Sequence, residues 1–205
     1  ADYNNKFSCT ISRNGDLLHR IYLECDISYT PGTTVTRTPG TGMAAATTTT
    51  TVNSVPDQVD FGFEIIDHVE VEIGGQCIDK HYGHWMDIWT SLSHNTDKYN
   101  MLGKLVDLTG SDQTGTTPSK VKRKVYIPLQ FWFCRNPGLA LPLIALQYHE
   151  VKLNVQFASK PTIGGLTAVN TGTGATGAQD GSHAIDRVCV FCDHIFLDTD
   201  ERRRF

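Results

Sequence analysis

The amino-acid sequence predicts an all-β protein, an antiparallel eight-stranded jelly-roll sandwich with one short helix and long loop insertions. Several segments alternate apolar and polar side chains, which is typical of half-buried antiparallel strands. Long segments rich in Thr, Gly and Ala separate these strands, and one stretch has the three- and four-residue spacing of a helix. Many strands with long connections and one helix favour a sandwich, and the number of strands suits a jelly roll.

The length and composition fit one globular domain covering residues 1–205. The 205 residues are 40% hydrophobic and 20% charged, and they contain no internal repeat. The formal net charge of −4 argues against binding nucleic acid mainly by electrostatics. No apolar run approaches the roughly 18 to 20 residues that span a bilayer, so we expect no membrane insertion, and the first residues lack the pattern of a signal peptide.

The densest apolar run, residues 127–157, is predicted to form the centre of the sandwich. A strand over residues 125–134 would turn a wholly apolar face to the core: Val125, Ile127, Leu129, Phe131 and Phe133. Pro128 favours an edge position or a bulge in this strand, because proline donates no ladder hydrogen bond. A turn at residues 136–138 and Pro142 then interrupt regular structure. Residues 151–157 alternate without exception, which predicts a half-buried strand.

Two strands at the N-terminus, residues 6–13 and 17–29, are predicted to form a hairpin. Asn14-Gly15 lies between them, and this pair favours the positive φ angles of a two-residue type I′ turn.

The remaining segments complete the predicted sandwich. A strand is expected over residues 61–73, and the last strand over residues 187–199 has apolar side chains on both faces, which indicates burial on both sides. Residues 30–57, 109–119 and 158–186 have too little apolar surface to offset the entropy of ordering them, so we expect three long loops.

The helix is predicted over residues 79–92, lying over the sheet or its end. Its apolar stripe contains Tyr82, Trp85, Met86, Trp89 and Leu92, and Asp79 can act as its N-cap.

Three spacings suggest a metal or redox site. His81, His84 and Asp87 could share a helical face, but no fourth ligand is visible and the same helix has a packing stripe. Cys189 and Cys192 would point to opposite faces of a strand, which favours core cysteines. Asp198 and Asp200 could bind a cation, but no neighbouring residue adds ligands. We therefore predict no metal site.

Catalytic and cofactor-binding residues are also not predicted, because no phosphate-binding, dinucleotide or nucleophile motif occurs. Two basic clusters are interpreted as solvated surface charge: Lys120, Lys122, Arg123 and Lys124, and residues 202–204, whose charge is offset by Asp198, Asp200 and Glu201. The six cysteines are too few for a disulfide scaffold, so we expect reduced thiols and assembly in a reducing compartment.

Four strings in this order along the chain carry a family resemblance. They are ISRNGDL at 11–17, VEVEIGGQCIDKHYGHW at 69–85, PGLALPLIALQYHEVKL at 137–153 and IFLDTDERRRF at 195–205. The chain resembles, from about residue 5 to its end, the first jelly-roll domain of the major capsid protein of nucleocytoplasmic large DNA viruses, and most closely those of algae and amoebae.

The resemblance implies a non-enzymatic structural protein of the virion. It implies the N-terminal half of a double jelly roll, with the second half outside this chain, that trimerises into pseudo-hexagonal capsomers tiling an icosahedral shell. The implied partners are further copies of itself, neighbouring capsomers and minor capsid proteins, without direct nucleic-acid contact, and the implied place of assembly is the host cytoplasm.

Two other functions are compatible with a β-sandwich. A carbohydrate-binding module would use aromatic side chains at loop tips, but Trp85, Trp89 and Trp132 all lie in periodic segments. A metal-dependent jelly-roll enzyme would need a bound metal.

Overall fold

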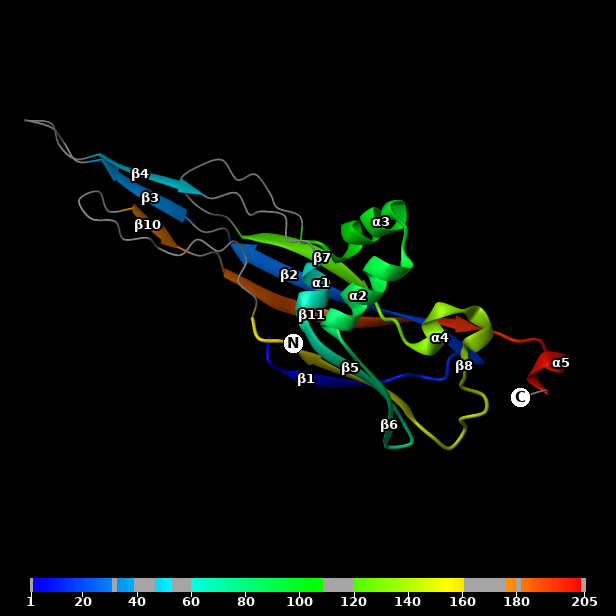
Figure 1. The fold of residues 1–205 in the computed structure, drawn as a ribbon. Coiled ribbons are helices and arrows are strands. Elements are labelled where there is room, and N and C mark those ends of the chain that lie inside the picture. Colours follow the sequence, from blue (N-terminus) through cyan, green and yellow to red (C-terminus); the bar gives the residue numbers. More distant parts are fainter. Residues whose placement is uncertain are drawn as a thin grey trace, which may run out of the picture.

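Two four-stranded antiparallel sheets face each other in the computed structural model, as the sequence predicts (Figure 1). The structure describes residues 2–30, 33–38, 47–52, 60–108, 120–160, 176–179 and 182–203. A third, smaller sheet extends beyond one end of the sandwich, and the C-terminus lies at the opposite end (Figure 1).

The first sheet has the strand order β1–β9–β5–β6. Its strands are β1 (Lys6–Thr10), β9 (Val151–Phe157), β5 (Ile66–Ile73) and β6 (Gln76–Tyr82). Phe7 lies opposite Val155, and Val155 lies opposite Val69, so these apolar side chains share one face. The alternation predicted for residues 151–157 is confirmed.

The second sheet has the strand order β11–β2–β7. Its strands are β11 (Ser182–Ile195), β2 (Leu17–Thr30) and β7 (Val121–Pro128), and β8 (Leu141–Pro142) pairs with the beginning of β2. Pro128 ends the edge strand β7, as its missing N–H group requires. The third sheet contains β10 (Thr176–Gln179), β3 (Thr33–Thr38) and β4 (Thr47–Val52).

The core lies between the two four-stranded sheets. Val69 and Val155 of the first sheet and Leu23 and Ile127 of the second are each 0% exposed and belong to one apolar cluster. Fully burying such a side chain stabilises the fold by roughly 1.5–3 kcal/mol.

Helices close one side of the sandwich. They are α1 (Phe61–Glu64), α2 (Gly83–Ser93) and α3 (Thr96–Val106), and α2 contacts β5 and β6 while α1 and α3 contact β7. Two further turns, α4 (Trp132–Arg135) and α5 (Thr199–Arg202), lie toward the C-terminal end together with a 3₁₀ turn at Pro137–Leu139 (Figure 1). No helix among the described residues is long and apolar enough to cross a membrane.

The helix predicted over residues 79–92 is confirmed for residues 83–92, but its start at Asp79 and the expectation of a single helix are wrong. Residues 76–82 pair with β5 as strand β6, and the helix begins at Gly83. A Cβ atom at Gly83 would lie 2.2 Å from the Phe63 carbonyl oxygen and 2.4 Å from that of Ile66, so only glycine permits this close approach. The second helix of eleven residues, α3, was not predicted.

The predicted hairpin between the first two strands is also wrong. β1 pairs with β9 and β2 pairs with β11, so residues 11–16 carry the chain from one sheet to the other. Asn14 and Gly15 do not have positive φ angles, whereas Gly74 and Gly75 do and form the two-residue turn between β5 and β6.

Two predicted strands are shorter than their apolar patterns. Phe61 and Phe63 lie in the helical turn α1, and the chain after Pro128 leaves the sheet and turns through α4. Phe61, Phe63, Phe131 and Phe133 are nevertheless all buried, because both turns lie within the apolar core cluster.

The three predicted loops are partly tested. Residues 30–57 contain β3 and β4, and residues 158–186 contain β10 and the beginning of β11, so these parts are strands. The predicted loop at 109–119 lies outside the described residues. The remaining parts of the other two predicted loops also lie outside them, except for residue 30 and residues 158–160 at the ends of these loops.

Candidate assembly surfaces

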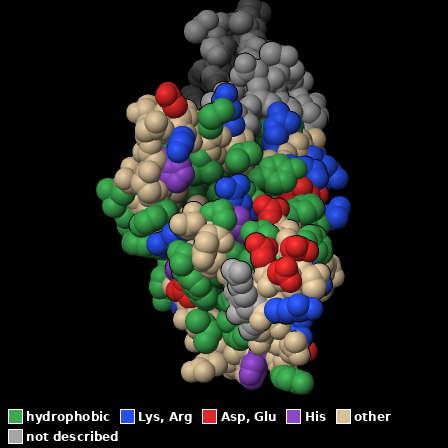
Figure 2. Space-filling model, turned by 90° about the vertical axis from the view of Figure 1, so that its right-hand side faces the viewer, with side chains coloured by type: hydrophobic (Ala, Val, Ile, Leu, Met, Phe, Trp, Pro, Cys, Tyr) green, Lys and Arg blue, Asp and Glu red, His purple; other side chains and the backbone are tan. Residues whose placement is uncertain are grey.

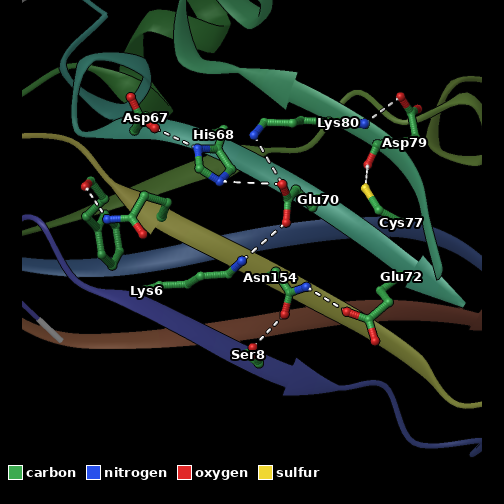
Figure 3. A network of polar contacts seen from close by, with 12 residues as sticks. Lys6, Ser8, Asp67, His68, Glu70, Glu72, Cys77, Asp79, Lys80 and Asn154 are labelled. Atoms are coloured by element: carbon green, nitrogen blue, oxygen red, sulfur yellow. Dashed lines mark hydrogen bonds and ion pairs between the residues drawn. The ribbon is translucent and has the colours of Figure 1, made fainter. Parts of the chain in front are cut away.

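The outer face of the first sheet carries a network of ion pairs around Glu70 (Figure 3). Lys6 Nζ lies 3.3 Å from Glu70 Oε2, and Lys80 Nζ lies 3.1 Å from Glu70 Oε1. His68 Nε2 approaches the same carboxylate at 3.6 Å. Burial alone would raise the pKa of Glu70, but hydrogen bonds from Lys80 and Lys6 outweigh it and lower this pKa.

A second chain of polar contacts continues across the same face (Figure 3). Ser8 Oγ donates to Asn154 Oδ1 at 2.5 Å, and Asn154 Nδ2 donates to Glu72 Oε2 at 3.1 Å. Asn154 is only 7% exposed, so its hydrogen bonds are required to offset the cost of burying an amide. The strands of this sheet therefore satisfy one another's polar groups on the outer face.

The outer face of the second sheet is polar on one half only. Lys124 Nζ donates to Glu24 Oε1 at 2.9 Å, and Tyr126 also hydrogen-bonds this carboxylate. The hydrogen bonds from Lys124 and then Tyr126 lower the pKa of Glu24, whose side chain is 9% exposed.

A row of apolar side chains crosses the other half of that face. Phe191 lies opposite Tyr22, which lies opposite Pro128, so the three form one row across β11, β2 and β7. Phe191 is 51% exposed, and Phe196, just after β11, is 68% exposed. We call Phe191, Tyr22, Pro128 and Phe196 the β11 face.

Burial of the last strand on both sides is therefore not found among the described residues. β11 is an edge strand, and Val188, Val190 and Cys192 pack partly against the core while Phe191 faces outward. The apolar residues that sequence reasoning assigned to a second buried face are present, but no described element of this chain covers them.

The residues of the considered His/Asp metal site do not converge. His81 lies on β6, is 8% exposed and stacks on Phe131 with ring centroids 4.8 Å apart, while its Nε2 atom lies 3.2 Å from Asp79 Oδ2. Burial lowers the pKa of His81, against the opposing effect of Asp79. His84 and Asp87 lie on α2, and no group of three or more potential metal ligands occurs within the described ranges.

The two cysteines of the considered zinc motif point to opposite faces of β11, as expected for a strand. Cys192 faces the core and burial raises its pKa to about 11, whereas Cys189 lies opposite Glu24 on the outer face. Only Cys192 is thus the core cysteine that was predicted for both. All six cysteines have free thiols.

The basic clusters form ion pairs on the surface. Lys120 and Lys122 each lie 3.9 Å from a carboxylate oxygen of Asp186. In the second cluster, Arg203 Nη1 lies 3.7 Å from Asp200 Oδ1, and residue 204 lies outside the described residues.

The three tryptophans occupy helical positions. Trp85 and Trp89 belong to α2 and Trp132 belongs to α4, so none stands at a loop tip as a sugar-binding module would place it.

One buried carboxylate, Asp16, was missed by sequence reasoning. It accepts hydrogen bonds from the Leu197 backbone N–H at 2.7 Å and from Arg202 Nε and Nη2 at 3.0 and 2.9 Å. The backbone N–H group of Leu197 lowers the pKa of Asp16 most, followed by Arg202. Asp198 in turn caps α5 by accepting from the Thr199 N–H group at 2.7 Å.

Asp16 and Arg202 together fix the segment that follows β11. Asp16 also exchanges backbone hydrogen bonds with Ile195 and Ile144, so the end of β11 and the segment after β8 meet at this residue. The only sequence signal was an acidic residue near the N-terminus and an arginine cluster near the C-terminus. Their contact could not be predicted, because the two lie far apart along the chain.

Comparison with known proteins gives consistent results. A family model described as "Major capsid protein N-terminus" matches residues 1–198. The major capsid protein of Pyramimonas orientalis virus is 42% identical over 205 residues, which are 100% of this chain and 43% of that protein. The major capsid protein of Paramecium bursaria Chlorella virus 1 is 36% identical over 204 residues, 99% of this chain and 38% of its own length.

Solved structures show the same fold. PBCV-1 VP54, from a crystal structure fitted into a reconstruction of the virophage Sputnik, matches with a TM-score of 0.64 and 33% identity over 100% of this chain and 41% of that one. The Faustovirus major capsid protein matches with a TM-score of 0.64 over 100% of this chain and 53% of that chain at 12% identity, which bears on the fold alone. This chain spans about two fifths of the length of the curated relatives it matches.

Proposed function

This chain belongs to the major capsid protein family of large DNA viruses, and we propose that it is the N-terminal jelly-roll domain, residues 1–205, of a shell-forming virion protein. The protein acts by assembly and needs no catalytic, cofactor or metal site. Three copies associate into a pseudo-hexagonal capsomer, and capsomers tile an icosahedral shell with minor capsid proteins, formed in the host cytoplasm.

The observation that carries this proposal is the β11 face. Phe191 is exposed and forms a row with Tyr22 and Pro128. Such an apolar row resembles the centre of a protein interface, where apolar side chains are buried by the partner. A second jelly roll of the same polypeptide would cover this row by packing sheet against sheet. The sequence shows that β11 has apolar side chains on both sides, and in the complete protein both sides would then be covered.

The opposite outer face supports the same arrangement. Its polar groups already satisfy one another around Glu70 and Asn154, so these groups need no partner from a second domain. At the C-terminal end of the molecule, hydrophobic side chains are interspersed with charged ones (Figure 2).

Sedimentation velocity and electron microscopy of the complete protein test the proposal. We expect closed oligomers built from trimers. A complete protein that remains monomeric at concentrations and salt conditions where related shells assemble would contradict it.

A further inference from the structure

Helices α2 and α3 carry exposed apolar side chains that the function described so far does not use. They are Trp85 (38% exposed), Ile88 (50%), Leu92 (82%), Met101 (69%) and Leu105 (41%), which we call the apolar ridge. Trp85, Ile88 and Leu92 follow one another at spacings of three and four along α2, so they share one side of this helix and are more than the scattered single residues of an ordinary surface.

The ridge exists because α2 packs through its other side. Gly83, Met86 and Thr90 are buried at spacings of three and four, and the Thr90 hydroxyl donates to the Met86 carbonyl at 2.7 Å, so its polar group is satisfied. This packing turns Ile88 and Leu92 toward solvent. The helical stripe seen in the sequence was real, but most of it faces outward.

At one end of the ridge, Trp85 is held by a stack of side chains. The rings of Trp85 and Trp89 lie 5.9 Å apart, and the Arg135 guanidinium lies 4.1 Å from the Trp89 ring centroid. His81 lies 6.4 Å from Trp85 on the other side. A surface held in one geometry loses little conformational entropy when a partner binds.

A cleft of about 860 Å³ adjoins the ridge and shares Trp85 and Ile88 with it. Four carboxylates line this cleft: Asp60, Glu64, Asp67 and Asp87. Burial raises the pKa of Asp60, and the neighbouring charge of Asp87 adds to this effect. Asp87 has no ion-pair partner among the described residues, so the cleft retains negative charge that a basic partner would neutralise.

The chain itself carries a basic segment whose charge is opposite to that of the cleft. Lys120, Lys122, Arg123 and Lys124 lie at the beginning of β7, and we call them the basic run. The Lys122 side chain is 76% exposed, and the Arg123 guanidinium donates to the Lys122 carbonyl at 3.3 Å. Within the described part of the subunit, Arg123 is thus a cation without an acidic partner.

We propose that the apolar ridge and its acidic cleft are a docking surface for a second copy of this protein, whose basic run enters the cleft. The inference rests on the proposed function and identifies the contact through which neighbouring subunits associate. An apolar centre with a charged rim has the composition of a protein interface. Because the two surfaces are different parts of one chain, the contact is heterologous, and repeating it around a rotation axis closes a ring.

The apolar part of the contact is tested with Ile88→Ser/Leu92→Ser in the complete protein, and with Leu92→Ser alone in case the double variant does not fold. The expected result is self-association weakened about tenfold or more, with an unchanged melting temperature of the subunit. Tyr148→Ser is the matched control, since Tyr148 is 93% exposed and lies outside the ridge. Normal self-association of folded ridge variants would overturn the inference, as would an equal loss in the control.

A charge exchange tests the identity of the partner. Asp87→Lys and Arg123→Glu should each weaken self-association, and both changes in one chain should restore it, because the pair is re-formed between copies with its signs reversed. Failure of the double variant to recover would overturn a second copy as the partner. If the wild-type complete protein does not self-associate at all, the proposed function fails, whereas normal assembly of every variant removes only the docking surface.

Discussion

The outer faces of the two sheets differ in how their side chains are paired within the chain. On the first sheet, Glu70 binds two lysines and Asn154 joins Ser8 to Glu72, so polar groups on all four strands are paired within the chain. On the second sheet, Phe191 and Tyr22 form an apolar row beside the Glu24–Lys124 pair.

The difference shows which face has its side chains paired within this chain. Breaking a polar contact on the first face should cost folding stability, since a buried group would lose its partner. Removing an aromatic ring from the β11 face should cost little stability in the isolated domain and should instead weaken its packing against the proposed second jelly roll. We therefore expect side chains on one face to act in folding and Phe191 and Tyr22 on the other to act between domains.

The largest effect is expected where the first sheet passes into the helices. Gly83→Val would force a side chain against the Phe63 and Ile66 carbonyl oxygens, which lie only 2.2 and 2.4 Å from the position of the added Cβ atom, and should destabilise the domain by about 4 kcal/mol or more. Urea unfolding measures this change. Gly138→Ala is the control, because its Cβ would lie 3.5 Å from the nearest atom and should leave the midpoint almost unchanged.

A smaller loss is expected at the end of the second sheet. Asp16→Ala leaves Arg202 and the Leu197 N–H group without their acceptor, so the urea midpoint should fall by less than in Gly83→Val and proteolysis after β11 should become faster. Asp200→Ala removes an equally charged residue whose side chain is 85% exposed and should have no such effect. Equal losses in the two variants would show that Asp16 does not fasten this segment.

The two faces can be compared directly with one variant on each. Glu70→Ala should lower the free energy of unfolding by about 1 kcal/mol, because the hydrogen bonds of Lys6 and Lys80 to a partly buried carboxylate are lost. Phe191→Ser should leave unfolding of this domain nearly unchanged and should lower the stability of the complete protein, in which the second jelly roll is proposed to pack on Phe191. The reverse pattern would contradict the division between a face that acts in folding of the domain and a face that acts between domains.

The smallest expected effect is a pH dependence from His81. Its pKa is lowered in the folded chain by burial, so the unfolded chain takes up a proton more readily, and stability falls as pH drops below the ordinary imidazole value of about 6.5. Thermal unfolding at about pH 8 and about pH 5.5 measures this loss. His81→Phe should abolish the dependence of stability on pH between these two values. The pKa values of Glu70 and Asp16 are lowered in the folded chain, so the loss of stability from protonating these two groups should begin only at about pH 4.

The sequence was informative where one face of a strand is buried. Residues 151–157 alternate because β9 lies between β1 and β5 with one face in the core, and the local pattern is sufficient to detect this. The apolar residues at 125–133 were likewise identified as core, although the chain leaves the sheet after Pro128.

The errors arose where distant contacts override local preferences. Asn14-Gly15 has the chemistry of a hairpin turn, but β1 gains more by pairing with β9, which lies far away along the chain. The strand pairing of residues 76–82 with β5 likewise displaces the helix start from Asp79 to Gly83. Helix α3 had a detectable signal in Asn95, whose side chain accepts from the Lys98 N–H group as an N-cap.

The candidate surfaces were only partly predictable. Sequence periodicity showed that β11 and α2 carry apolar stripes, but it assigned both to the interior, because periodicity reports an apolar face and not what covers it. The acidic cleft and the Asp16–Arg202 contact join residues from separate segments, which no local pattern records.

The sharpest test of the role proposed for the β11 face is hydroxyl-radical footprinting of the complete protein before assembly. If the second jelly roll of the same polypeptide covers this face, Phe191, which is 51% exposed in this domain, should be strongly protected already in the unassembled protein. Full reactivity of Phe191 in the complete protein would contradict that role.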